Sequence, residues 1–277
     1  MKILNAPAVL GGFKTSFTVS FVWVGSMVLL PLTMLLLTVL QLEWHSFWQI
    51  IFSQRVIASI LLSFQMALIA TLVNLVFGTL IAWVLVRYSF PGKALINALI
   101  DLPFALPTAV AGIVLATLYA PNGLIGQWFA QIGWQIAFTP IGIAIALVFV
   151  SFPFIVRAVQ PVLATQERAL EEAADILGAN RWLTVRKVIL PTLYPAIVNG
   201  AGMGFARALG EYGSVIFIAG NIPLVSEIAP LMIMSKLDIY DVKGAAAVAF
   251  VMLVLSFAVL LLFNLWQNYL NRFFVSK

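Results

Sequence analysis

The chain contains no cysteine, and His45 is its only histidine. The first absence excludes a disulfide framework, an iron–sulfur cluster and a cysteine-ligated zinc site, and the second argues against a histidine-based metal site. No Gly-x-x-x-x-Gly-Lys-Ser/Thr phosphate loop occurs, so any ATPase must be a separate polypeptide. An integral-membrane enzyme is also disfavoured, because the sequence has no Ser/His/Asp set, HExxH motif or paired catalytic carboxylates.

Charge is scarce as well. Only 9% of the 277 residues are charged, 63% are hydrophobic, and the mean hydropathy is +1.08. A soluble chain of this length would need more charge on its surface, so the composition predicts an all-α integral membrane protein. The pI near 9.6 reflects basic loops rather than nucleic-acid binding, because no basic run interleaves with aromatic residues in a soluble segment. Without an internal repeat or soluble segment, residues 1–277 are expected to form one membrane domain.

Six membrane spans are expected, since a helix needs about 20 apolar residues to cross the hydrocarbon core. The uncharged run over 102–156 is too long for one helix, and Pro121-Asn-Gly123 divides it. The predicted spans cover 15–42, 56–86, about 94–120, about 138–158, about 192–219 and about 244–270. Between the third and fourth spans, residues 124–132 carry apolar side chains on one helical face, which predicts a short interfacial helix.

The basic residues predict the orientation of these spans. Six spans place both termini on one side, together with Lys and Arg at positions 2, 14, 87, 93, 157, 168, 181, 186, 187, 272 and 277. The opposite side holds only Arg55, Lys236 and Lys243. Cytoplasmic loops carry the excess of basic residues, so both termini and the 158–191 loop are predicted to be cytoplasmic. The first apolar run is longer than a signal-peptide core and lacks a cleavage-type small-x-small site before Glu43, so we expect it to be retained.

The 158–191 loop carries a helix–turn–helix pattern. Leu170, Ala173, Ala174 and Leu177 form a narrow apolar face, and Glu167, Glu171, Glu172 and Asp175 line much of the remainder. Gly178 suits the left-handed end of this helix, Asn180 can cap a second short helix, and Pro191 suits a helix start after Leu190. A solvated amphipathic connector would show the same face.

The spacing in this loop resembles the EAA motif of ABC importer permeases: Glu-Ala-Ala, three residues, Gly, nine residues, Ile-x-Leu-Pro. Val188 stands where the motif has Ile. The resemblance implies a six-helix importer-type permease whose cytoplasmic coupling helix docks on a nucleotide-binding subunit. The residues expected to form this ATPase-docking loop are Glu171, Glu172, Ala173, Ala174, Gly178, Leu190 and Pro191.

Two stretches of the predicted spans contain features that are unusual inside a membrane: ionisable residues in one and helix-breaking prolines in the other. An ionisable residue at the bilayer centre costs roughly 2.5–3.5 kcal/mol on insertion scales. Arg207 and Glu211 are four apart and can pair on one helix face, either as an internal salt bridge or with Arg207 offering charge to an anion. The 101–112 stretch has two prolines four apart, which indicates a plain kink or a pore-lining broken segment. The candidate pathway or gate residues are Asp101, Pro103, Phe104, Pro107, Thr108, Arg207 and Glu211.

The stretches 101–112 and 205–221 resemble the corresponding segments of T-type permeases of sulfate/thiosulfate importers. This resemblance extends over nearly the whole chain. The resemblance implies a second, W-type permease, two copies of an ATPase that uses ATP and Mg, and a periplasmic sulfate-binding protein. This chain itself is expected to bind no cofactor, metal or nucleic acid, and to sit among lipids in a bacterial-type plasma membrane. A molybdate or tungstate permease and an ATP-independent secondary transporter or channel remain as alternatives.

Overall fold

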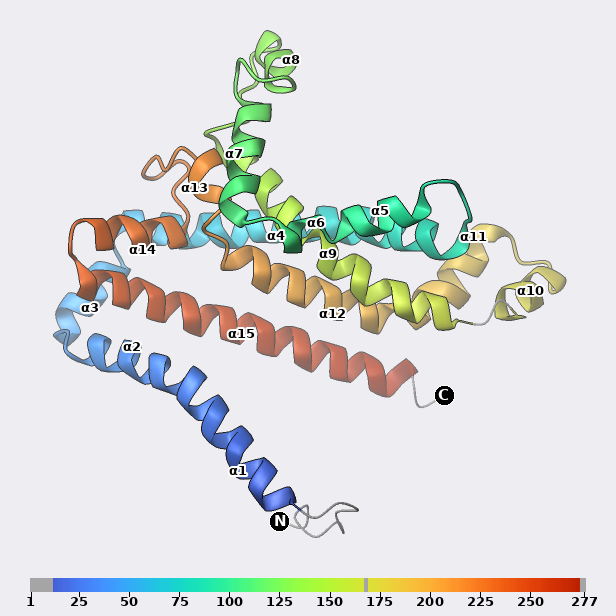
Figure 1. Ribbon diagram of the computed structural model, residues 1–277, viewed down its shortest axis with the longest axis horizontal. Helices are drawn as coiled ribbons and strands as arrows, with labels where there is room; N and C mark the ends of the chain where they lie inside the picture. The colour runs from blue at the N-terminus through green and yellow to red at the C-terminus, as the bar shows by residue number, and fades with distance from the viewer. Residues whose placement is uncertain (1–11, 167–168, 275–277) are drawn as a thin grey trace.

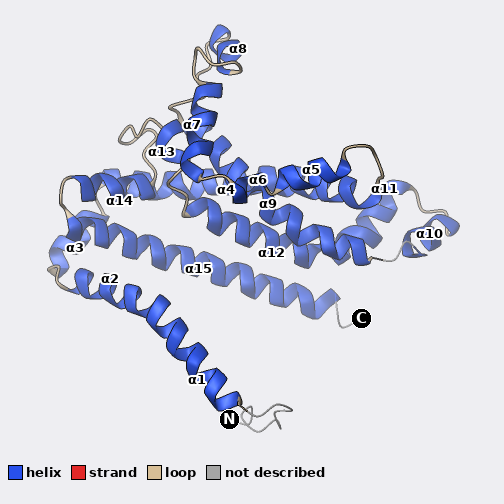
Figure 2. Cartoon of the chain, in the orientation of Figure 1, coloured by secondary structure: helices blue, strands red, loops and turns tan. Residues whose placement is uncertain are grey.

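The computed structural model describes residues 12–166 and 169–274, and within these ranges the secondary structure is helical with no strand (Figure 2). Most helices run nearly parallel, so the molecule is elongated along them (Figure 1). The helices are α1 (Phe13–Val24), α2 (Leu30–Leu40), α3 (Trp44–Ile51), α4 (Gln54–Arg87), α5 (Lys93–Ile100), α6 (Leu102–Ala105), α7 (Thr108–Tyr119), α8 (Gly126–Gln131), α9 (Pro140–Thr165), α10 (Ala169–Ile176), α11 (Arg181–Thr184), α12 (Leu190–Leu209), α13 (Val215–Ile218), α14 (Ala229–Asp238) and α15 (Val242–Phe274). Two π-type turns, η2 (Gly25–Leu29) and η3 (Val185–Ile189), join α1 to α2 and α11 to α12.

Five helical segments of the described chain are long and apolar enough to cross a membrane. They are Phe13–Leu40, Gln54–Arg87, Pro140–Thr165, Arg181–Leu209 and Val242–Asn268. The all-α membrane architecture expected from composition is therefore confirmed, and these segments correspond to the first, second, fourth, fifth and sixth predicted spans.

The predicted third span is not one continuous helix. Residues 94–120 are divided among α5, α6 and α7, and the break falls within the 101–112 stretch that the two prolines marked. Leu106 and Pro107 have extended backbone between α6 and α7, where a proline removes a backbone donor and disfavours helix at the residue before it. From this break α7 points away from the long bundle towards α8 (Figure 1). Of the two readings left open for the 101–112 stretch, a plain kink or a broken segment, the helix break is therefore the one observed.

The fifth span also differs from its prediction. It begins at Arg181 and ends at Leu209, rather than running from about 192 to 219. The second short helix expected in the loop is thus the start of the span: α11, η3 and α12 keep helical backbone through Val185 and Leu190. Since 158–165 belong to α9, the connection between the fourth and fifth spans is shorter than the predicted 158–191. The sequence analysis missed α3 and α14 entirely.

Small residues let the central helices α4, α9 and α12 approach closely. A Cβ at Gly78 would lie 3.1 Å from the Ile155 side chain, and one at Gly200 would lie 2.9 Å from the Cβ of Ala158. Lipid gives no hydrophobic drive between helices, so such close packing and buried hydrogen bonds hold them together. Asn74 of α4 supplies such buried hydrogen bonds to α9: its Nδ2 donates to Val148 O at 3.0 Å and to the Ser151 hydroxyl at 2.9 Å.

Candidate functional site

The helix α10 is the most solvent-exposed part of the predicted docking loop. None of its residues is buried, and Ile176 and Leu177 just at its end are each 86% exposed. Leu170 is half exposed as well, whereas Ala174 of the same predicted face is partly covered, so Leu170 and Leu177 leave much of this apolar face open to solvent. Glu167, which was expected to border this face, lies outside the described residues.

The turn after α10 has the geometry that its sequence predicts. Gly178 has a φ of +79°, the left-handed conformation that favours glycine, and its N–H donates to Asp175 O at 2.9 Å. Ala179 N donates to Ala174 O at 3.0 Å, and Asn180 Oδ1 then accepts from Leu183 N at 2.8 Å as the cap of the next helix. The predicted ends of both helices are therefore confirmed.

An ion pair fixes α10 to the bundle. Glu171 pairs with Arg87, the last residue of α4, whose side chain is only 10% exposed. The Arg87 guanidinium also lies 5.8 Å from the centre of the Trp83 ring, within cation–π range. Glu172 stays exposed, while Leu190 and Pro191 lie in the fifth span rather than in the loop. Glu171 and Gly178 thus set the position of α10, and the two motif residues farthest along the chain belong to the helix that follows.

Asp101 lies at the break between α5 and α6, where it pairs with Arg157 of α9. Arg157 Nε donates to Asp101 Oδ1 at 2.8 Å, and its Nη2 donates to Oδ2 at 2.6 Å. The same guanidinium donates to the side chain and the carbonyl of Asn97 and to Gln160 Oε1. Sequence reasoning counted Arg157 only as a basic loop residue. The signal was available, since Asp101 and Arg157 directly flank the 102–156 uncharged run.

The broken segment and the predicted Arg207–Glu211 stretch meet in space. A Cβ at Gly213 would lie 2.2 Å from the Thr108 hydroxyl, and one at Gly112 would lie 2.3 Å from Ser214 O. Only glycine permits such an approach, so the two stretches are packed backbone to backbone at Gly112, and at Gly213 the backbone packs against the Thr108 side chain. Phe104 packs edge-on against Phe154 of α9 with ring centroids 5.3 Å apart. Pro103 lies in α6, and Pro107 precedes the first residue of α7.

The Arg207–Glu211 pair expected from the four-residue spacing is present. Arg207 Nη1 lies 2.6 Å from Glu211 Oε2, although Glu211 is just past the end of α12. The Glu211 side chain is 2% exposed and also accepts from the N–H and hydroxyl of Ser214, at 2.8 and 2.9 Å. The Arg207 side chain remains 34% exposed. A buried carboxylate with three partners therefore holds a partly accessible guanidinium, an arrangement that can offer hydrogen-bond donors to an anion.

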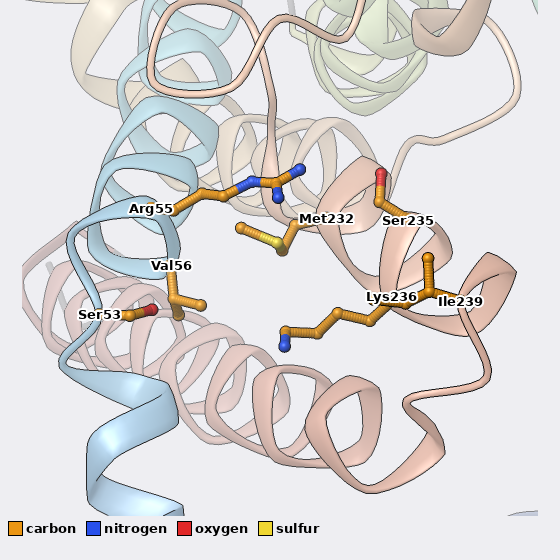
Figure 3. Close-up of a pocket in the computed structure, with 7 residues that line it drawn as sticks. All are labelled: Ser53, Arg55, Val56, Met232, Ser235, Lys236 and Ile239. Atoms are coloured by element: carbon orange, nitrogen blue, oxygen red, sulfur yellow. The ribbon is translucent and has the colours of Figure 1, made fainter.

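A second polar cluster lies at the opposite end of the long helices from α10. Arg55 and Lys236 line a pocket of about 290 Å³ with Ser53 and Ser235 (Figure 3). Both cations are paired: Arg55 donates twice at 2.7 Å to the buried Glu227, and Lys236 donates at 2.9 Å to Asp241.

This pairing also affects Asp241. The hydrogen bond from Lys236 holds the pKa of Asp241 below its ordinary value, and the N–H of Gly244 adds to the effect. Sequence analysis placed Arg55 and Lys236 on one side of the membrane but did not pair them. Separately, among residues 12–166 and 169–274, no group of three or more His, Cys, Asp or Glu side chains is placed to hold a metal ion.

Comparison with known proteins decides the family. Residues 74–275 match the family described as the binding-protein-dependent transport system inner membrane component. The chain belongs to this family. The predicted docking loop and both intramembrane stretches lie within the matched range, so the family assignment covers every candidate site residue.

Relatives of the permease are similar over most of its length. It is 44% identical over 272 residues to the sulfate transport system permease protein CysT of Escherichia coli (strain K12), covering 98% of each chain. It is 45% identical to the protein of the same name from Synechocystis sp. (strain ATCC 27184 / PCC 6803 / Kazusa), covering 98% of this chain and 95% of that one. Over 76% of this chain and 74% of the relative, it is 52% identical to a probable sulfate transport permease of Nephroselmis olivacea.

Solved structures confirm the permease fold. A chain of a bacterial ABC transporter involved in the import of the acidic polysaccharide alginate superposes with a TM-score of 0.77, covering 92% of this chain and 94% of that chain. The identity is only 15%, so this likeness concerns the fold. A chain of the MetNI methionine ABC transporter in an inward-facing conformation gives a TM-score of 0.60.

Proposed function

We propose that this permease is the T-type subunit of an ATP-driven importer that carries sulfate and thiosulfate across a bacterial-type plasma membrane. Its partners in this proposal are a W-type permease, two copies of an ABC ATPase that bind ATP and Mg, and a periplasmic sulfate-binding protein. The chain itself contributes the anion path and the mechanical coupling, and it binds no cofactor. Support for the cargo comes from similarity to sulfate permeases over most of the chain.

The main structural support for the importer mechanism is that α10 is exposed and is connected along the chain to Arg207. The Gly178 turn leads directly into the helical segment Arg181–Leu209, whose last turn carries Arg207. At about 1.5 Å per residue this segment places roughly 39 Å between Arg181 and Arg207. The helical backbone is continuous over that length, through the π-type turn at Val185–Ile189 and past Pro195, and so connects its first turn to the paired Arg207 at its other end.

The proposed cycle follows from this connection. The ATPase dimer closes on ATP and displaces α10, and the Arg87–Glu171 pair passes part of the movement to α4. Movement of the fifth span shifts Arg207 relative to the Thr108 end of α7, where the two stretches are in contact. Arg207 offsets the charge of the passing anion, and the broken segment helps to gate it. Binding stays weak because a conduit must release its cargo.

The orientation proposed from the basic residues agrees with the arrangement of the helices. The first described turns of α1 and the end of α15 point towards the same end of the bundle as α10 (Figure 1). Arg55 and Lys236 lie at the other end, near α3 and α14. We therefore assign the α10 end to the cytoplasm, with both termini, and the Figure 3 pocket to the periplasmic side.

The test is uptake of labelled sulfate into proteoliposomes that contain this permease with its partner permease, ATPase and binding protein. We expect uptake that requires ATP and resists excess molybdate. Uptake abolished by molybdate would move the cargo to molybdate or tungstate within the same mechanism. Uptake without ATP or without the ATPase would instead support a secondary transporter or channel and overturn the importer proposal.

A further inference from the structure

A long apolar groove runs along the bundle between α4, the Arg181–Leu209 segment and α15. Its volume is about 1030 Å³, at the upper end of the range for ligand pockets. Along α4 it extends from Leu68 to Trp83, roughly 22 Å at about 1.5 Å per residue. One leaflet of the hydrocarbon core is roughly 15 Å thick, so the groove is long enough for an extended acyl chain.

Aromatic side chains line the end of the groove nearest α10. Trp83 comes from the last turns of α4, Trp182 from the first turn of the fifth span, and Trp266 from the last third of α15. Tryptophan is favoured at the level of lipid headgroups, where its ring is apolar and its N–H reaches a polar partner. This end of the groove is therefore placed at the membrane interface, and the Leu68 end lies deeper in the hydrocarbon.

Basic side chains stand at the same end. Arg186 lies one helical turn after Trp182 and one turn before Leu190, and both of these neighbours line the groove. Lys187 follows it, and both cations are exposed. Neither makes a hydrogen bond or ion pair with any residue of the described ranges, in contrast to Arg87 and Arg157. The groove thus combines an apolar channel with exposed positive charge at its headgroup-level end.

We propose that the groove is a binding site for an anionic phospholipid, with an acyl chain along α4 and its phosphate on Arg186 and Lys187. A neutral partner helix would fill the apolar part but would bring no counter-charge to either cation. An anionic headgroup satisfies both features, and basic residues near an anionic leaflet each favour binding by about fivefold.

The bound lipid also bears on coupling, a consequence that rests on the proposed function of α10. Trp83 lies under the Arg87 guanidinium, which pairs with Glu171 of α10, and Trp182 lies just past the Gly178 turn. A lipid in contact with both rings fixes the two attachments of α10 to the bundle. Anionic lipid therefore favours the docked position of the coupling helix and raises the transport obtained per ATP hydrolysed.

The first experiment measures the lipid directly, with no dependence on the cargo. The complete transporter is purified in nanodiscs of equal parts phosphatidylglycerol and phosphatidylcholine, released, and analysed by native mass spectrometry for retained lipid. We expect phosphatidylglycerol to be retained in preference. Arg186→Gln should lower that preference by about fivefold, and Lys14→Gln, which removes an exposed charge from α1, a helix that does not line the groove, should not change it. Equal retention of both lipids, or equal effects of the two variants, overturns the proposal.

A second experiment identifies the occupant of the groove. Leu72 lines it and is 53% exposed, whereas Leu61, 54% exposed on the same helix, does not line it. A photo-crosslinking residue in place of Leu72 should yield a phospholipid adduct, and a cross-link to the second permease overturns the lipid assignment. Leu72→Trp should reduce phosphatidylglycerol retention while Leu61→Trp leaves it unchanged, with copurification of the ATPase reporting assembly in both. Retention unaffected by Leu72→Trp also overturns the proposal.

Discussion

Replacing Gly178 by alanine is the sharpest test of the docking loop. Gly178 has a φ of +79°, and no atom lies within 4 Å of a Cβ built there, so the substitution acts on backbone conformation and not by steric clash. Holding an L-residue in this conformation costs roughly 1–2 kcal/mol. That cost lowers the ratio of turned to opened loop by a factor of about 5–30.

The readout is docking of the ATPase and transport per ATP. If α10 docks only with the turn formed, the apparent Kd of the permease pair for its ATPase should rise by up to the same factor of about 5–30, because the competent conformation is less populated. Sulfate uptake per ATP hydrolysed should fall with it. Both quantities are measured on reconstituted complexes, by titration of labelled ATPase and by parallel uptake and phosphate-release assays.

Two control variants separate the docking role from a general effect of strain. Gly133 has nearly the same φ, +78°, with equally open surroundings, and lies in the turn after α8, far from α10 (Figure 1). Gly133→Ala should leave ATPase affinity unchanged. Gly178→Asn should preserve most of the coupling, because asparagine tolerates the left-handed region. Wild-type affinity and coupling in Gly178→Ala, or an equal loss in Gly133→Ala, would refute the reasoning.

Three further predictions concern the membrane stretches and the outer end. Arg207→Ala should reduce sulfate uptake per assembled complex, since an accessible guanidinium is lost; equal uptake would leave the residue only a structural role. Gly112→Ala places a Cβ 2.3 Å from a backbone oxygen and should destabilise the complex by about 1–3 kcal/mol, seen as a lower Tm, whereas Gly210→Ala, with 3.8 Å of room, should not. The depressed pKa of Asp241 means that its pairing with Lys236 stabilises the fold fully above the ordinary Asp value, near pH 4, and is lost as pH falls through the lower folded value. Acid-unfolding curves of wild type and Asp241→Asn should therefore differ at neutral pH and converge at low pH; curves that differ equally at every pH would contradict this.

Local patterns account for most of what the sequence predicted correctly. The apolar runs fixed five long helices because a membrane-spanning helix satisfies its backbone internally, without help from distant residues. The Gly178 turn and the Asn180 cap were predictable for the same reason: each depends on one residue and its immediate neighbours. The Arg207–Glu211 pair followed from a spacing of four, which the end of α12 only slightly distorts.

The errors occurred where continuity or distance mattered. Hydropathy does not register the loss of a backbone donor, so the 94–120 stretch has the hydropathy of one span although its helix is broken at Leu106 and Pro107. Asp101–Arg157 and Arg55–Glu227 join residues 56 and 172 positions apart, and only the first pair left a trace in the sequence, as the two charges that flank the 102–156 run. The sequence shows that these four residues are charged, but it does not show which of them form ion pairs.

By itself, the sequence determined that this is an all-helical membrane permease with a short helix, closed by a glycine turn, after its fourth span. Composition, periodicity and short motifs are sufficient for that, because each acts over one or two helical turns. Only the tertiary structure decided that the docking turn leads without interruption to Arg207, and that the broken segment meets the 211–214 stretch at Gly112 and Gly213. The physical reason is that these relations depend on how closely helices pack in three dimensions, which the small side chains of this chain permit but do not specify.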